Sequence, residues 1–382
     1  MGFLKNKIFI YLFVLSVALS GCAKPLILVN FVSNYGDFNR VTSGGVKAFY
    51  TDRTLGDSLK LIWNEKTHGG YANTFLRAYK DILFVPDLSG IITAFDFKTG
   101  KELGAIKNNG EIRAAPILYK TTLIFIVNNL NENYGTLHFY NLTNGWDYKV
   151  KIPFGSKGEL LGTKENLFVL AKNGTLYKFN YQRRKLWQTN ATGLTFCSPT
   201  LDANQIFFGN QKGELISVDS KTGKIWYRRK ISAGFEGGIT SFNGSLFIGD
   251  KNGIVYKVST DEGRVVWKFD TGSKIKNFIT FHNKQIFVGN LAGKLYSFNM
   301  DTGEVNWTSY IGGVINATPL IFNNYIVQPN LNKNTYIIDI NNGKIKRTIK
   351  FDNKCRTAPG YYQGMLYFGI DNGEIYAYEV IE

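Results

Sequence analysis

The chemically reactive side chains of this chain are few and widely separated. Its three cysteines, Cys22, Cys197 and Cys355, form neither a Cys-x-x-Cys pair nor the Cys-x-x-Cys-His run that attaches haem. Three histidines also stand apart from one another and share no motif: His68, His138 and His282. We therefore expect no metal site and no bound cofactor.

Sequence motifs that usually carry catalysis are missing as well. The sequence has no glycine-rich phosphate loop and no nucleophile elbow. Its acidic residues fall mostly at regularly spaced turns, where an Asp or Asn side chain has a local structural role. These features predict a binding or scaffolding protein with no catalytic residues.

One cysteine has a position with chemical meaning. Cys22 ends a segment that has two lysines near its start, an apolar run over residues 8–19 and the small pair Ser20 and Gly21. A basic start, a short apolar core and a small-residue cleavage site are typical of a secretory signal peptide, and the apolar run is too short to span a bilayer comfortably. Residues 1–21 are therefore predicted to be a signal peptide.

The last four residues of this segment, 19–22, resemble the lipobox of bacterial lipoproteins, in which the cysteine thiol receives a diacylglycerol and becomes the new N-terminus. The resemblance implies lipidation at Cys22. Ala23 after it implies sorting to the outer membrane of a Gram-negative bacterium, with the protein facing the periplasm. The alternative is an ordinary signal peptide in which Cys22 is incidental. Residues 22–57 show no clean period, and we expect a lipidated N-terminus and tether there.

From about residue 58 onward the chain repeats. A turn that begins with Asp or Asn in most copies recurs at one step of 45 residues and then at steps of 39 or 40. The fifth positions of these turns are Gly100, Gly145, Arg184, Gly223, Gly263, Gly303 and Gly343. Asp or Asn can hydrogen-bond its own turn and Gly allows a positive φ, so each copy predicts a tight connection between strands.

Stretches that alternate with a period of two, such as residues 294–298, precede these turns and indicate strands. Each repeat has room for four short strands and no helix, which is typical of a β-propeller blade. Seven turns are visible, and the last repeat lacks its outer strand, which residues 59–63 can supply. The sequence therefore predicts an all-β, eight-bladed β-propeller of four-stranded blades over residues 58–382, closed by an N-terminal strand that completes the last blade.

A tryptophan follows several of these turns after three or four residues, and Trp63 belongs to the same series: Trp187, Trp226, Trp267 and Trp307. One large ring per blade is expected to dock neighbouring blades. Stacking on a sugar or nucleobase is the alternative, but a ligand site needs converging residues. The ring also places Cys197 and Cys355 four repeats apart, on opposite sides, so both thiols are expected to be unpaired.

The formal net charge is +16. Nucleic acid, an anionic membrane surface or an acidic partner would each fit a basic protein. The lysines are scattered rather than clustered, however, and Lys, Asn, Ile and Phe are abundant throughout the chain. We interpret the charge as a solvated surface and expect no nucleic-acid partner.

An Asp-x-x-Thr-Gly-Lys turn followed by Trp, clearest over residues 219–226, resembles the repeat of the pyrroloquinoline-quinone propellers. With the lipobox and a single eight-bladed domain, the chain is similar to the BamB family of outer membrane protein assembly lipoproteins. The resemblance covers the lipobox and roughly residues 58–382. It implies a non-catalytic scaffold that binds the periplasmic POTRA region of BamA within the outer membrane protein assembly complex.

In that family, loops around the fourth blade contact BamA. The corresponding stretches here are residues 194–197 and 234–237, so the resemblance makes four residues the expected partner-binding set: Leu194, Thr195, Phe196 and Glu236. The family's arginine in the first loop has no counterpart in this sequence. Glu236 can equally be an ordinary solvated loop acid.

Two other functions fit parts of the sequence. Quinone-dependent dehydrogenases share the repeat, but in them the quinone stacks against a vicinal disulfide, and this chain has no adjacent cysteines. An envelope propeller that binds glycan or lipopolysaccharide would use both the basic charge and the aromatic residues, although repetition alone accounts for the aromatics. The insertion over residues 128–134 in the second repeat has no assigned role.

Overall fold

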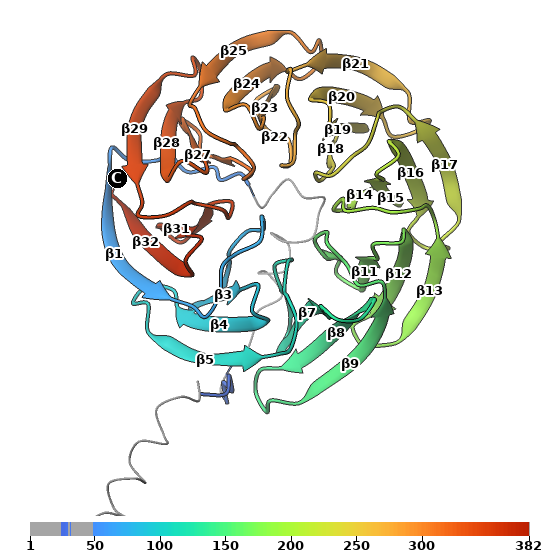
Figure 1. Ribbon diagram of the computed structural model, residues 1–382, viewed down its shortest axis with the longest axis vertical. Helices are drawn as coiled ribbons and strands as arrows, with labels where there is room; N and C mark the ends of the chain where they lie inside the picture. Colours follow the sequence, from blue (N-terminus) through green and yellow to red (C-terminus); the bar gives the residue numbers. More distant parts are fainter. Residues whose placement is uncertain (1–23, 30, 32–48, 382) are drawn as a thin grey trace, which may run out of the picture.

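The computed structural model describes residues 24–29, 31 and 49–381. Eight antiparallel sheets of four strands each are arranged as blades around a central axis (Figure 1). The predicted eight-bladed all-β propeller is thus confirmed. Within the described part of the chain, no helix is long and apolar enough to cross a membrane.

The first four blades follow one another along the chain, each running from its innermost to its outermost strand. Blade 1 contains β2 (Arg77–Tyr79), β3 (Ile82–Pro86), β4 (Ile91–Asp96) and β5 (Glu102–Lys107). Blade 2 contains β6 (Ile117–Tyr119), β7 (Thr122–Asn128), β8 (Tyr134–Asn141) and β9 (Asp147–Pro153). Blade 3 contains β10 (Leu161–Gly162), β11 (Asn166–Leu170), β12 (Thr175–Asn180) and β13 (Lys185–Asn190). Blade 4 contains β14 (Thr200–Asp202), β15 (Gln205–Gly209), β16 (Glu214–Asp219) and β17 (Ile225–Lys230).

The next three blades repeat this order. Blade 5 contains β18 (Thr240–Phe242), β19 (Ser245–Gly249), β20 (Ile254–Ser259) and β21 (Val265–Asp270). Blade 6 contains β22 (Thr280–His282), β23 (Gln285–Gly289), β24 (Lys294–Asn299) and β25 (Val305–Tyr310). Blade 7 contains β26 (Leu320–Ile321), β27 (Tyr325–Pro329), β28 (Asn334–Asp339) and β29 (Ile345–Lys350).

Blade 8 closes the ring with strands from both ends of the chain. It contains β30 (Gly360–Tyr362), β31 (Met365–Gly369), β32 (Glu374–Ile381) and, as its outermost strand, β1 (Ser58–Lys66). β1 pairs antiparallel with β32 from Ser58 opposite Ile381 to Lys66 opposite Glu374, and Figure 1 shows the blue strand beside the red one. The predicted closure by the N-terminal strand is therefore confirmed.

The hydrophobic core lies between neighbouring blades. The second strand of a blade is covered on both sides, so it reads as a continuous apolar run, as in Leu246–Phe247–Ile248 of β19, all fully buried. The outermost strands have one face toward solvent and alternate instead. The core clusters combine adjacent blades; Phe207 of blade 4, for example, packs in one cluster with Leu246 of blade 5.

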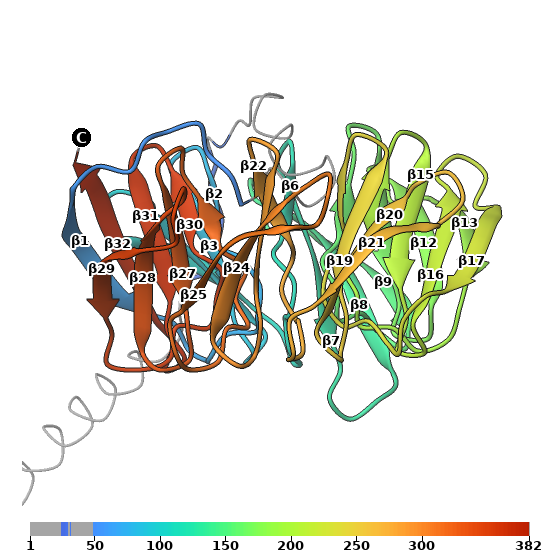
Figure 2. The ribbon, with the colours of Figure 1, turned by 90° about the horizontal axis from the view of Figure 1, so that it is seen from above.

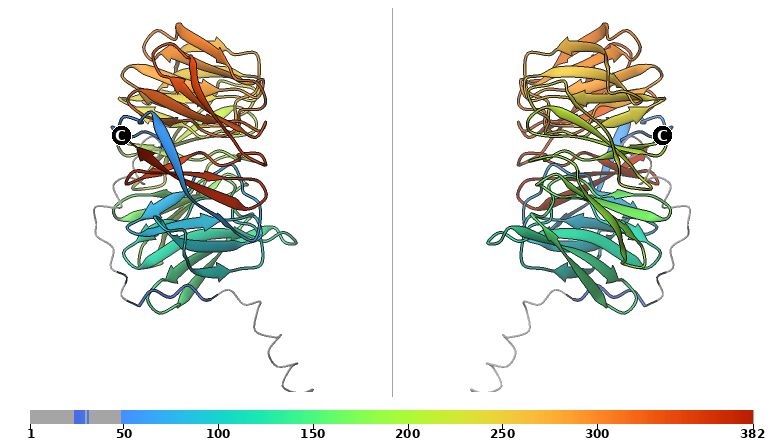
Figure 3. Two further views of the ribbon diagram at one scale, coloured as in Figure 1. Left: turned by 90° about the vertical axis from the view of Figure 1, so that its left-hand side faces the viewer. Right: turned by 90° about the vertical axis from the view of Figure 1, so that its right-hand side faces the viewer.

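Figures 2 and 3 show the ring from the side, with the β7–β8 hairpin extending beyond one face. Its tip is the insertion noted in the sequence, and Leu130 there is 70% exposed. Residues 49–57, which precede β1, run along blade 7: the carbonyl of Phe49 accepts a hydrogen bond from Ile321, and the carbonyl of Leu55 accepts one from Asn324. Phe49 is buried near the central axis.

Candidate functional site

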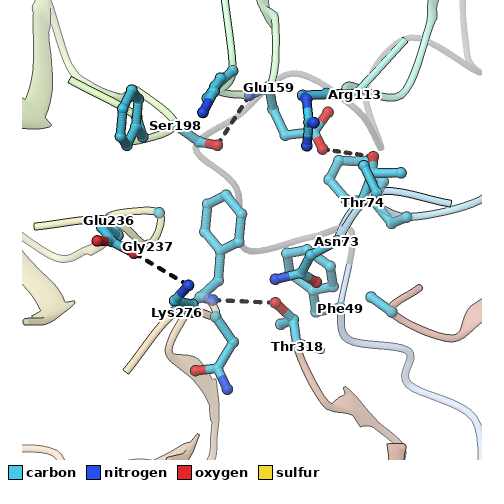
Figure 4. Close-up of a pocket in the computed structure, with 18 residues that line it drawn as sticks. Phe49, Asn73, Thr74, Arg113, Glu159, Ser198, Glu236, Gly237, Lys276 and Thr318 are labelled. Atoms are coloured by element: carbon cyan, nitrogen blue, oxygen red, sulfur yellow. Dashed lines mark hydrogen bonds and ion pairs between the residues drawn. The ribbon is translucent and has the colours of Figure 1, made fainter. Parts of the chain in front are cut away.

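A pocket of about 190 Å³ opens at the central axis, where the loops that join successive blades converge. We call it the axial pocket. Blades 1 to 8 all approach it through these loops, and the lining residues used below are Thr74, Lys157, Glu159, Phe196, Glu236 and Lys276. Figure 4 shows Thr74, Glu159, Glu236 and Lys276 around the cavity. The pocket forms because, in each repeat, the loop that follows the outer strand runs toward the central axis.

Glu159 is the deepest charged group of the axial pocket. Its Oε1 accepts a hydrogen bond from the Thr74 hydroxyl at 2.7 Å, and its Oε2 accepts one from the Ala115 amide at 2.8 Å. Removal from water raises the pKa of Glu159 to about 7, although the nearby Arg77 charge and these hydrogen bonds oppose the shift. This carboxyl is held in place by two blades at once and ties their inner ends together.

Basic side chains also line the axial pocket. The ammonium of Lys157 lies 4.2 Å from the centre of the Phe196 ring, a cation–π distance. Partial burial and the charge of Arg113 lower the pKa of Lys157. Arg113 itself binds Glu111 through two hydrogen bonds of 2.5 and 2.7 Å. The pocket therefore combines positive charge with an aromatic face.

Glu236 contributes the second carboxylate of the pocket, and lysines hold it. Its Oε1 accepts a hydrogen bond from Lys274 at 2.7 Å, and its Oε2 lies 3.4 Å from the Lys276 ammonium. Partial burial acts against ionisation, but the Lys274 hydrogen bond and the two positive charges outweigh it and lower the pKa of Glu236. Glu236 is thus a fixed negative charge at the rim.

The predicted partner-binding residues fall around this pocket. Phe196 and Glu236 line it, and Leu194 lies in the same loop as Phe196 with 54% of its surface exposed. Thr195 differs from these three because it is buried, and its hydroxyl donates to the carbonyl of Gly209 at 2.6 Å. The structure therefore brings two of the four side chains, Phe196 and Glu236, to the pocket, leaves Leu194 exposed in the loop of Phe196, and places Thr195 inside that loop as a brace.

Sequence reasoning missed the charged partners of these residues. Lys157 and Glu159 come from the loop between blades 2 and 3, and Arg113 comes from the loop between blades 1 and 2. A usable signal existed, because each loop after an outer strand must reach the axis of a propeller. Charged residues at that point of several repeats were therefore candidates for one shared site.

Tryptophans on the outer strands lie between blades. Each of four indole N–H groups donates to a backbone carbonyl of the next blade at 3.0 to 3.2 Å: Trp63 to Phe97, Trp187 to Lys221, Trp267 to Met300 and Trp307 to Ile340. Each ring also covers a glycine of the next blade's turn. At Gly343, for example, a Cβ atom would lie 2.5 Å from the Trp307 ring.

Trp226 departs from the expected docking role. It is 60% exposed, and Tyr227 takes the docking position, with its hydroxyl donating to the carbonyl of Thr260 at 3.2 Å. The register explains the difference: Tyr227 lies opposite Ser217, as Trp307 lies opposite Ser297. Trp226 is one residue earlier, and successive side chains of a strand point to opposite faces.

The remaining candidate groups have structural surroundings. Cys197 and Cys355 are buried and unpaired, and burial raises the pKa of each thiol to about 12. His138 stacks on Phe125 and has Asp147 at 2.8 Å from its Nδ1. Among the described residues, no three or more His, Cys, Asp or Glu side chains are grouped closely enough to hold a metal ion. Cys22 lies outside the described residues.

Comparison with known proteins gives matches by sequence pattern and by fold. The family model of outer membrane protein assembly factor BamB matches residues 88–250 and 225–321. No curated protein matches the chain. The solved structure of BamB from Moraxella catarrhalis is similar with a TM-score of 0.69 and 16% identity, covering 84% of this chain and 100% of that chain.

Other solved structures with this fold have different origins. Quinohemoprotein alcohol dehydrogenase from Comamonas testosteroni has a TM-score of 0.72 and 11% identity, covering 87% of this chain and 79% of that chain. The computationally designed Ika8 protein has a TM-score of 0.73 and 14% identity, covering 84% of this chain and 100% of that chain. At such identities the likeness concerns the fold alone, which occurs in an enzyme as well as in an assembly factor.

Proposed function

The chain belongs to the family of outer membrane protein assembly factor BamB, and we propose that it is a non-catalytic scaffold lipoprotein of the outer-membrane β-barrel assembly machinery. In this proposal it binds the periplasmic POTRA region of BamA and assists insertion of outer membrane proteins. The observation that carries the proposal is that Phe196 and Glu236 both line the axial pocket, with the exposed Leu194 in the same loop as Phe196. The family resemblance implies partner contact at these same three positions.

Chemistry at this face suits a protein partner. Leu194 presents an exposed apolar side chain, and Phe196 of the same loop forms a mixed aromatic and cationic surface with Lys157. Such a mixture of an apolar anchor with oriented charges is typical of protein interfaces.

The loop that carries Leu194 is also held by its own backbone contacts. The amide of Thr195 donates to the carbonyl of Lys172, and the carbonyl of Leu194 accepts from the amide of Gln211. Both bonds tie the loop to hairpin turns of the flanking blades. A rigid loop loses little conformational entropy on binding, so these bonds support a docking role.

The export half of the proposal depends on the first residues of the chain. Residues 1–21 would act as a signal peptide and Cys22 would carry the lipid, which would hold the protein at the outer membrane on its periplasmic side. Mass spectrometry of the mature N-terminus tests this half, because a diacylglyceryl Cys22 is expected there. An unmodified N-terminus at another residue would overturn it.

Co-purification of BamA with the lipidated protein from native membranes tests the scaffold half. We expect Leu194→Asp to reduce recovery of BamA, because the charge would be buried against the partner. Leu186→Asp is the matched control, since Leu186 is 43% exposed on outer strand β13 of the neighbouring blade. Equal recovery with both variants, or recovery of a glycan-binding complex in place of BamA, would reject the proposed contact.

The quinohemoprotein neighbour makes a dehydrogenase the second candidate. A quinone at the axis of this ring would need a flat stacking partner and free carboxylates toward a cation. Glu159 and Glu236 of the axial pocket are both already bound, by Thr74 and Ala115 and by lysines, so the described lining does not fit that group. Absorption spectra of the purified protein titrated with pyrroloquinoline quinone test this, and stoichiometric binding would favour the dehydrogenase.

A further inference from the structure

The seam between blades 1 and 2 is built differently from those that carry a tryptophan. The position taken by Trp307 in β25 is taken in β5 by Gly104, which lies opposite Ala94 as Trp307 lies opposite Ser297. A Cβ atom at Gly104 would lie 2.9 Å from the carbonyl oxygen of Lys24, and its φ is 148°. The space of the missing ring is therefore occupied by the chain that follows Ala23.

Residues 24–28 bind both blades through the backbone. The Ala105 amide donates to the carbonyl of Lys24 at 2.9 Å, and the Leu26 amide donates to the carbonyl of Ala105 at 3.2 Å. On the side of blade 2, the Leu28 amide donates to the carbonyl of Leu142 at 2.6 Å. Figure 1 shows this short dark-blue segment outside β5.

Side chains of the same segment fill the seam. Leu26 is fully buried in a cluster that joins Phe84 of blade 1 to Leu142 of blade 2, and its carbonyl accepts a hydrogen bond from the Tyr140 hydroxyl at 2.9 Å. Ile27 lies over Gly145, the turn glycine that a docking ring would cover in a tryptophan-bearing seam. The segment thus replaces the docking aromatic with its own backbone and two aliphatic side chains.

Covalent distance links this seam to the proposed anchor. Cys22 precedes Lys24 by two residues, and two residues span at most about 7 Å when fully extended. A lipid on Cys22 would therefore enter the bilayer within a few ångströms of the point where Lys24 leaves blade 1.

We infer that the outer edge of blades 1 and 2 is the surface that meets the membrane, and that residues 24–28 hold it there without a flexible spacer. The inference rests on the proposed lipidation of Cys22. It assigns an interaction surface whose partner is a lipid bilayer, and it gives the ring one orientation relative to that bilayer. Restricting the anchor to one edge also leaves the axial pocket at a defined distance from the membrane.

Fluorescent probes on two equivalent positions test the orientation. Lys107 is the last residue of β5 in blade 1, and Asp270 is the last residue of β21 in blade 5, on the opposite side of the ring; both are exposed. Lys107→Cys and Asp270→Cys would be labelled in the full lipidated protein. Labelling is selective because burial protects Cys197 and Cys355.

The labelled proteins are placed on vesicles of phosphatidylethanolamine and phosphatidylglycerol that contain a doxyl-labelled lipid as quencher. We expect quenching of the probe at position 107 to exceed that at position 270 several-fold. Equal quenching at the two positions would overturn the inference. Failure of the protein to join the vesicles would overturn it too, because no lipid would then be present.

Gly104→Ala tests whether the seam segment sets the orientation. The new Cβ would clash with the backbone of residues 24–26, so hydrogen exchange at the Leu26 and Ala105 amides should accelerate and the difference in quenching should shrink. Gly193→Ala is the matched control, since nothing lies within 4 Å of its Cβ position. An unchanged difference in Gly104→Ala would contradict the inference. Recovery of BamA is measured in a separate experiment, so failure of the proposed BamA contact would not affect the quenching result.

Discussion

Truncation of Trp307 should show how strongly one ring holds two blades together. Trp307 is 9% exposed, its indole N–H donates to the carbonyl of Ile340 at 3.0 Å, and its ring covers Gly343. Trp307→Ala removes the buried ring together with its hydrogen bond to Ile340 and its contact with Gly343. Trp226→Ala makes the same chemical change at a ring that is 60% exposed.

The expected magnitude follows from burial. A buried Trp covers about 150–250 Å² of surface, and at about 25 cal/mol per Å² this corresponds to about 4–6 kcal/mol. Truncation of large aromatic core residues costs about 3–5 kcal/mol, and that range already includes partial relaxation. We therefore expect Trp307→Ala to lower the free energy of unfolding by about 4 kcal/mol. Trp226→Ala should change it by less than about 1 kcal/mol, as most surface substitutions do.

Urea denaturation followed by circular dichroism measures both variants against the parent chain. The urea midpoint for Trp307→Ala should fall clearly, while the slope of the unfolding free energy against urea concentration stays similar. The midpoint for Trp226→Ala should stay near that of the parent. Equal losses in the two variants would refute the assignment of docking to the ring opposite Ser297 in blade 6 and opposite Ser217 in blade 4. A larger loss in Trp226→Ala would refute it as well.

Three further outcomes can be checked with the same protein. Because burial raises the pKa of Glu159 to about 7 from 4.5, the folded chain binds that proton more tightly than the unfolded chain. The free energy of unfolding should therefore fall by up to about 3 kcal/mol as the pH rises from about 4.5 to 7, and Glu159→Gln should flatten this slope in urea titrations at several pH values. Cys197 and Cys355, with their pKa raised to about 12, should react with a thiol reagent at pH 8 only after denaturant is added; fast reaction in the folded protein would contradict their burial. Tyr227→Phe should cost about 1 kcal/mol in urea denaturation through loss of the bond to Thr260, and no change would argue against its docking role.

The architecture could be predicted from the sequence because its signals are local and repeated. A turn at Asp219–Gly223 recurs with a nearly constant step, and each copy needs only its own residues to form. Closure of the ring could be predicted by counting strands, because the last blade lacked its outer strand and residues 59–63 formed a strand that belonged to no other blade. A long repetitive fold is therefore more predictable than its length suggests.

The error at Trp226 shows where such reasoning ends. Composition favoured Trp226 over Tyr227 as the docking ring, but a shift of one residue reverses the face of a strand. Only the register, with Tyr227 opposite Ser217, decides which of the two adjacent rings points to the next blade. A count of four residues from the turn glycine, as in Trp267 after Gly263 and Trp307 after Gly303, would have selected Tyr227 after Gly223.

Contacts between distant repeats were beyond sequence reasoning for a different reason. Glu159 meets Thr74 and Ala115 because three loops converge on one axis, and no periodic pattern records which loop meets which. The burial of Leu26 between blades 1 and 2 could not be predicted either, because residues 22–57 have no period. Only one seam is filled by such a segment, so no other repeat contains an equivalent sequence for comparison. In both cases the contact occurs once in the ring, so the repeat pattern does not predict it.

Cross-linking in living cells tests the scaffold function most directly. A photoreactive amino acid at position 196, beside the axial pocket, is predicted to form a covalent adduct with BamA upon illumination. The same amino acid at position 268, on exposed outer strand β21, serves as the comparison and should form none. No BamA adduct at position 196, or equal adducts at both positions, would contradict the account of this propeller as a scaffold that docks BamA around its axial pocket.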